Sequence, residues 1–142
     1  NNTATFYSRN NAFSMMGFDT FTSKECMNIS QYTPNGNWPT DDVLVQETVK
    51  AMNATENQSD FVYTITVEGH GDYPTEKVLE NPDILVSGAA DEASNNQWEY
   101  YVNMIHEVDD FIGSQRLTAA ERTPSSCSSA IISQRWDLPM RI

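Results

Sequence analysis

The chain has 142 residues, of which 39% are hydrophobic and 11% aromatic, and this composition fits one globular domain rather than a disordered chain. Eight basic residues stand against twenty acidic ones, which gives a formal net charge of −12. Phosphate backbones and anionic surfaces repel such a charge, so a nucleic-acid partner is excluded, and no apolar stretch approaches the length of a membrane span.

The first segment predicts a short helix. Aromatic and polar residues alternate between Thr3 and Phe21. Gly17 is expected to end this helix, because glycine tolerates the positive φ at which many helices stop.

A second helix is predicted from Thr40 to about Met52. Thr40 is interpreted as its N-cap, and Asp41 and Asp42 as an acidic first turn that the helix dipole stabilises. Apolar residues at spacings of three and four predict its inward face: Val45, Val49 and Met52, with Leu44 alongside.

A buried strand is predicted over Phe61–Val67, where every residue is β-branched or aromatic. The polar segment Glu68–Asp72 follows it directly. In open α/β sheets ligands bind at the carboxyl ends of the strands, so this segment is a candidate ligand site.

A long amphipathic helix is predicted from Asp91 to Ile112, with Gly113 as its end. Its predicted inward residues are Trp98, Tyr101, Ile105, Val108 and Ile112. The order helix, strand, helix predicts the α/β class.

His70 is the most informative candidate site residue, because it follows the predicted strand between Gly69 and Gly71, which let a ligand approach the backbone. A turn histidine without a task is an equally supported alternative. His106, in mid-helix beside Glu107, is interpreted as a solvated residue.

Arg9 lies two residues after Tyr7, and its planar guanidinium suits fork-like recognition of a phosphate or sulfate. A surface ion pair is the alternative. The chain contains no glycine-rich phosphate loop, zinc-type His/Cys spacing or nucleophile elbow, so neither a catalytic residue nor a metal ligand is assigned.

Four blocks, in order, resemble the lipoteichoic acid synthases and related sulfatase-domain proteins of the alkaline-phosphatase-like superfamily. They are Phe6–Asn11 with Met16–Phe21, Asn37–Asp42, Phe61–Pro74, and Tyr100–Asn103 with Val108–Gly113. In this family a Thr nucleophile and the first metal carboxylate lie in a part of the domain upstream of Asn1, so we expect an internal fragment that is inactive by itself. The turn Gly71–Pro74 is one residue longer than the family's.

The resemblance implies part of an alkaline-phosphatase-like α/β/α sandwich and, in the complete enzyme, Mn²⁺ or a similar divalent cation. It implies phosphoryl-group transfer on lipid-linked glycerol phosphate. The alternatives are hydrolysis of a small anionic sulfate or phosphate ester, and a non-catalytic anion-binding fragment. Arg9 and Tyr7 would hold the anionic headgroup, and His70 would contact phosphoryl or glycerol oxygens. The expected location is the extracytoplasmic side of a bacterial membrane, reached through an N-terminal anchor.

The family next has a strand ending in Gly-Asp-His, whose last two residues bind metal, whereas this chain has a serine-rich run over Thr123–Ser129. Residues 1–117 are therefore interpreted as part of the catalytic domain, and residues 118–142 as a frame-shifted or disordered tail. Reading the last base of each codon with the first two of the next, over Thr123 to Trp136, permits that Gly-Asp-His order. We expect the tail to stay outside the sheet, because buried unpaired hydroxyls would cost roughly 1–3 kcal/mol each.

Overall fold

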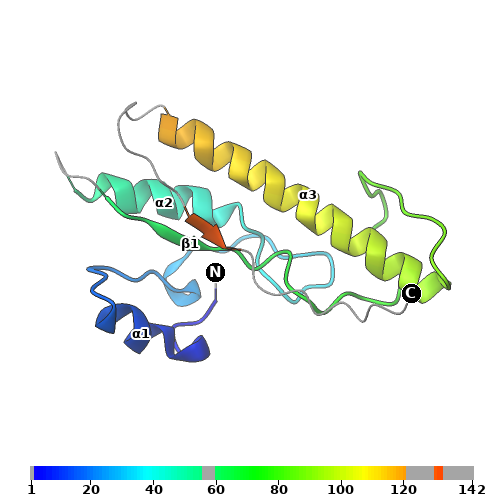
Figure 1. Ribbon diagram of the computed structural model, residues 1–142, viewed down its shortest axis with the longest axis horizontal. Coiled ribbons are helices and arrows are strands. Elements are labelled where there is room, and N and C mark those ends of the chain that lie inside the picture. The colour runs from blue at the N-terminus through cyan, green and yellow to red at the C-terminus, as the bar shows by residue number, and fades with distance from the viewer. Residues whose placement is uncertain (1, 56–59, 121–129, 133–142) are drawn as a thin grey trace.

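The computed structural model describes residues 2–55, 60–120 and 130–132. Its elements are η1 (Phe6–Ser8), α1 (Arg9–Met15), η2 (Lys24–Cys26), α2 (Val43–Asn53), β1 (Tyr63–Ile65), α3 (Glu92–Ala120) and β2 (Ala130–Ile132). β1 and β2 pair in parallel, and α3 lies between them in the sequence, so the three elements form a β-α-β unit. Figure 1 shows α3 along one side of the strands and α1 on the other. The predicted α/β class is confirmed.

The first predicted helix is present as α1. It ends at Met15, and Gly17 adopts a φ of +86° two residues later. The role predicted for Gly17 is thereby confirmed, since a residue with a side chain would be strained there.

α2 begins at Val43 and not at the acidic pair, so the predicted start of this helix was wrong. Asp42 precedes it without a side-chain cap, and its first turn contains no acidic residue. Asp41 is fully buried and turned toward the end of β1 instead. The Asp41 carboxylate, which was predicted to stabilise the start of the helix, therefore accepts hydrogen bonds from backbone amides after β1.

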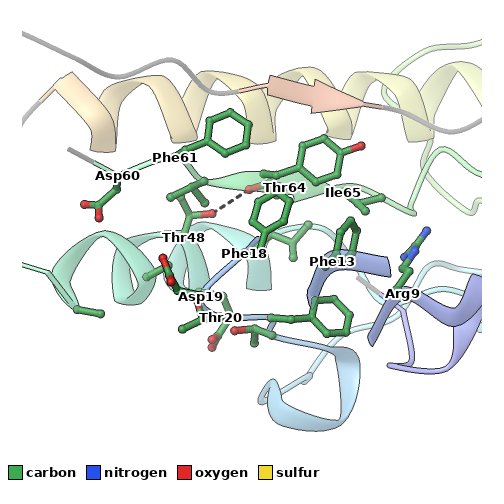
Figure 2. Close-up of a pocket in the computed structure, with 18 of the residues that line it drawn as sticks. Arg9, Phe13, Phe18, Asp19, Thr20, Thr48, Asp60, Phe61, Thr64 and Ile65 are labelled. Atoms are coloured by element: carbon green, nitrogen blue, oxygen red, sulfur yellow. Dashed lines mark hydrogen bonds between the residues drawn. The ribbon is translucent and has the colours of Figure 1, made fainter. Parts of the chain in front are cut away.

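The inward face of α2 agrees with the prediction at Leu44 alone, because Leu44 and Thr48 are its buried residues. Thr48 Oγ1 lies 3.3 Å from Thr64 Oγ1 of β1 (Figure 2). This contact attaches α2 to the strand through hydroxyl groups, which a pattern of apolar residues does not reveal.

The strand predicted over Phe61–Val67 is confirmed as a strand, but β1 spans only Tyr63–Ile65. Phe61 is 65% exposed and β1 itself is only half-buried, so the predicted burial was wrong for this part of the segment; the buried residues follow the strand, from Thr66 to Gly69. Burial is thus concentrated at the carboxyl end, where the candidate site lies.

α3 begins after Asp91, whose Oδ1 accepts the backbone N–H of Ser94 at 2.7 Å. It then passes through Gly113, so the predicted end was wrong. Gln115 is buried beyond the glycine and donates to Leu44 O at 3.1 Å and Thr48 Oγ1 at 3.2 Å. These tertiary hydrogen bonds stabilise the helix beyond Gly113, although glycine has a low helix propensity.

The buried face of α3 is made by Tyr100, Tyr101, Met104, Val108 and Phe111. It contains Tyr101 and Val108 of the predicted set, whereas Trp98 is 38% exposed. None of the helices among residues 2–55 and 60–120 is long and apolar enough to cross a membrane.

Part of the predicted tail lies in the sheet. Ala130–Ile132 pairs with β1 in the register Tyr63 with Ala130, and α3 continues through Thr118 to Ala120. The expectation that the tail stays outside the sheet was wrong for Ala130–Ile132, because a parallel ladder is formed by backbone groups and needs no particular side chains. The serine run Ser125–Ser129 lies outside the described residues, and the frame-shift hypothesis stays a prediction.

Candidate functional site

A tight turn follows β1 and carries His70. The backbone N–H of His70 donates to Val67 O at 2.9 Å, and Gly69 is buried against α3. A Cβ on Gly69 would lie 3.1 Å from Ile105 Cδ1, so the close packing of the turn on α3 explains the glycine.

His70 is half-buried and lies against Trp38. The two ring centroids are 4.9 Å apart, and Trp38 Nε1–H donates to Gly71 O at 3.2 Å. Trp38 therefore contacts both the imidazole and the backbone beside it, which restricts the orientation of the imidazole.

The side-chain amides of Asn35 and Asn37 bind Asp72, which follows Gly71 in this loop. Asn35 Nδ2 donates to Asp72 O at 3.0 Å, and Asn37 Nδ2 donates to Asp72 Oδ2 at 2.5 Å. Asp72 has a φ of +90°, which is strained for a residue with a side chain, and these bonds hold it there.

Arg9 lies at one end of a cavity of about 450 Å³ formed by α1, α2, β1 and the loop after α1. Figure 2 shows Arg9 at one end of this cavity and Asp60 at the other, with Phe13 and Phe18 between them. Arg9 is only 7% exposed, and its Cζ lies 5.2 Å from the centre of the Phe6 ring. Among the described residues, no carboxylate forms an ion pair with it.

Burial lowers the pKa of Arg9, and the hydroxyls of Tyr63 and Tyr7 act in the opposite direction. Arginine stays protonated despite such a shift, so the Arg9 end of the cavity keeps a positive charge, although Asp19, Glu47 and Asp60 also line the cavity. The aromatic wall and this cation suit a ligand with an anionic head.

The structure brings two of the three predicted site residues near each other. The Tyr7 side chain is 74% exposed and acts electrostatically on Arg9, although it does not line the cavity. His70 does not line it either and lies at the end of β1. Their assigned roles stay predictions.

Two buried carboxyl groups, which the sequence reasoning missed, hold the turn before His70. Asp41 Oδ1 accepts the N–H of Val67 at 3.0 Å, and Oδ2 accepts that of Glu68 at 3.1 Å. Glu68 Oε2 in turn accepts the N–H of Asp41 at 2.9 Å. The one available signal was the position of Glu68 between a strand and a glycine, while Asp41 resembled an ordinary helix-start residue.

Glu68 is neutral at physiological pH. Burial raises its pKa to about 9, the Glu107 carboxyl beside it adds to the rise, and the N–H of Asp41 opposes it. Glu68 Oε1 is buried without a hydrogen-bond donor in the described part of the chain. The buried position of Oε1 and the nearby Glu107 carboxyl both favour the protonated form of Glu68.

A family model described as Sulfatase matches residues 1–120. The chain belongs to the sulfatase family. This confirms the superfamily of the resemblance, and the match covers the Arg9 cavity, the His70 turn and α3. No curated protein and no solved structure matches the chain.

Sulfatase-family domains belong to hydrolases and transferases of the alkaline-phosphatase-like fold, which generally use metal ions. Within residues 2–55, 60–120 and 130–132, no group of three His, Cys, Asp or Glu side chains is placed to hold such an ion. Asp41 directs both of its oxygens to backbone N–H groups.

Proposed function

We propose that this chain forms the anion-binding part of a phosphoryl-group transferase acting on lipid-linked glycerol phosphate. The observation that carries the proposal is the buried guanidinium of Arg9, which faces a cavity without a carboxylate partner among the described residues. A buried charge is destabilising unless it is paired, so a ligand anion bound beside Arg9 would be stabilising.

The chemistry of Arg9 fits a phosphoryl group. Its planar fork donates two parallel hydrogen bonds to phosphate or sulfate oxygens. The aromatic wall of Phe13 and Phe18 excludes water from one side, which strengthens those bonds. Tyr7, exposed beside Arg9, adds a hydroxyl donor for the same headgroup.

His70 is proposed to contact the phosphoryl or glycerol oxygens. Its position at the end of β1 supports this, because ligands of open α/β sheets bind at the carboxyl ends of strands. The contact with Trp38 restricts the orientation of the imidazole, which favours its use as a substrate-binding group.

The remaining parts of the proposal concern the complete enzyme. Mn²⁺ or a similar divalent cation, a membrane anchor and an extracytoplasmic location would accompany this activity, as in the lipoteichoic acid synthases that the chain resembles. No step of the reaction is assigned to the cation from the residues described.

Hydrolysis of a sulfate or phosphate ester is the second candidate, because the family match supports it equally and the Arg9 fork accepts either anion. Mass spectrometry of the complete enzyme with Mn²⁺, given glycerophospholipid in one arm and an aryl sulfate in the other, separates them. Transfer of glycerol phosphate supports the proposal. Release of sulfate without lipid turnover would show that the enzyme is a hydrolase and not a transferase. Anion binding without any turnover would show that the chain is a non-catalytic binding module.

A further inference from the structure

The turn before His70 is held by a reciprocal pair of side chains that belong to two different segments. Asp41 precedes α2 and accepts from the amides of Val67 and Glu68, and Glu68 accepts from the amide of Asp41. Asp41 is 0% and Glu68 2% exposed, so water does not compete for these bonds. We call these two residues the carboxyl clamp.

The segment that supplies Asp41 also supplies Trp38, three residues earlier. Trp38 contacts the imidazole of His70 and donates to Gly71 O, while Asp41 holds the backbone on the other side of His70. Pro39, between them, is fully buried. The Trp38–Asp41 segment therefore contacts the backbone on both sides of His70.

We infer that Asp41 is a positioning residue for His70: the carboxyl clamp sets where the imidazole stands for an anionic ligand. The inference deepens the proposed function and rests on it, because it takes the ligand of His70 to be a phosphoryl group. Asp41 itself touches no ligand in this assignment, since both of its oxygens are occupied by backbone amides.

The charge state of the clamp suits this task. The titratable groups that face Glu68 are Asp41, from the segment before α2, and Glu107 and Tyr100 from α3. With its proton retained, Glu68 adds no negative charge near an incoming anion. A charged Glu68 would repel both the ligand and Asp41.

The test uses the full chain and the imidazole NMR signals of its two histidines. His106, on α3, serves as the internal reference for His70. Asp41→Asn places an amide NH₂ against one of the two backbone N–H groups and breaks the clamp. Asp42→Asn is the matched control, because Asp42 is the exposed neighbour and makes no bond to the turn. The probe is inorganic phosphate.

In the wild-type chain and in Asp42→Asn, phosphate is expected to shift the His70 signal. In Asp41→Asn the His70 signal should already be shifted before phosphate is added, and the variant should bind phosphate about tenfold more weakly. The His106 signal should be the same in all three chains. Equal His70 behaviour in the two variants would overturn the positioning role. If the His70 signal moves in Asp41→Asn but responds to phosphate neither in that variant nor in the wild-type chain, the positioning role stands and the proposed function is overturned.

A second variant decides the matter if Asp41→Asn does not fold. Glu68→Gln mimics the protonated side chain, so it should fold and keep the His70 signal. In the wild-type chain the His70 signal should show a transition near pH 9 as Glu68 ionises, below the raised pKa values of Tyr73, Tyr100 and Tyr101. Glu68→Gln should abolish it. Persistence of that transition, or its absence from the wild-type chain, would show that the clamp does not act on His70.

Discussion

The Arg9 cavity and the carboxyl clamp bury charged groups in opposite ways. Arg9 is buried against aromatic rings, and its charge faces an open cavity. Asp41 is buried with both oxygens directed to backbone amides, and Glu68 is buried with Oε2 directed to the amide of Asp41 and keeps a proton. A buried guanidinium without a carboxylate partner in the described residues is available to a ligand, whereas a buried carboxyl group that accepts from backbone amides fixes the backbone.

The largest effect is expected at Arg9. Arg9→Ala should weaken binding of glycerol phosphate by about 100-fold, because one or two charge-assisted hydrogen bonds are lost. Arg9→Lys keeps the charge but not the fork and should fall between wild type and Arg9→Ala. Isothermal titration measures this, with Lys77→Gln, an exposed basic residue, as control. Equal affinity in Arg9→Ala and wild type would mean that the cavity charge serves folding only.

Glu68→Gln tests the other side of the comparison through the pH dependence of stability. Glu68 keeps its proton to about pH 9 in the folded chain but releases it near 4.5 in the unfolded chain, so stability falls as pH rises between these values. Glutamine cannot ionise. At about pH 8 the variant should be more stable than wild type by on the order of 1–3 kcal/mol, and at about pH 4 nearly equal.

Urea unfolding at the two pH values measures this difference. Glu107→Gln is a useful companion, since it removes the neighbouring carboxyl while leaving Glu68 in place. A wild-type stability that does not fall between these pH values would show that Glu68 ionises freely in the fold.

Gly69→Ala probes the packing of the turn on α3. The added methyl would lie 3.1 Å from Ile105 Cδ1, so we expect a loss of about 1 kcal/mol. Gly71→Ala is the matched control, because its Cβ would meet nothing within 4 Å. Thermal unfolding compares them, and Ile105→Val should restore stability to Gly69→Ala by making room. A loss in Gly71→Ala as large as in Gly69→Ala would contradict the packing argument.

The smallest effect is expected from Trp38→Phe, which keeps a ring against His70 but removes the Nε1–H bond to Gly71 O. Because Trp38 is half-buried, the loss should be about 0.5 kcal/mol, with faster modification of His70 by diethylpyrocarbonate. Trp98→Phe, at an exposed position on α3, is the control. An unchanged modification rate would place the control of His70 in the clamp alone.

Much of the fold was predictable because it depends on neighbours in sequence. Gly17 ends α1 by its own conformational freedom, and the β-branched run around Tyr63–Ile65 forms a strand. The apolar period of α3 also predicts a long helix. Its end was not predictable, because Gln115 is held by bonds to α2, which is distant in the sequence.

Some features of the candidate site were likewise predictable from neighbouring residues, and others depend on tertiary contacts. The sequence determined the α/β class, the position of His70 after a strand and, through its motifs, the sulfatase family. Only the tertiary structure decided that Arg9 is buried without a carboxylate partner in the described residues. It also decided that Asp41, predicted to lie in the first turn of a helix, instead accepts from amides beyond β1. The physical reason is that dihedral preferences act between adjacent residues, whereas burial and the hydrogen bonds that compensate it join residues only after the chain has folded.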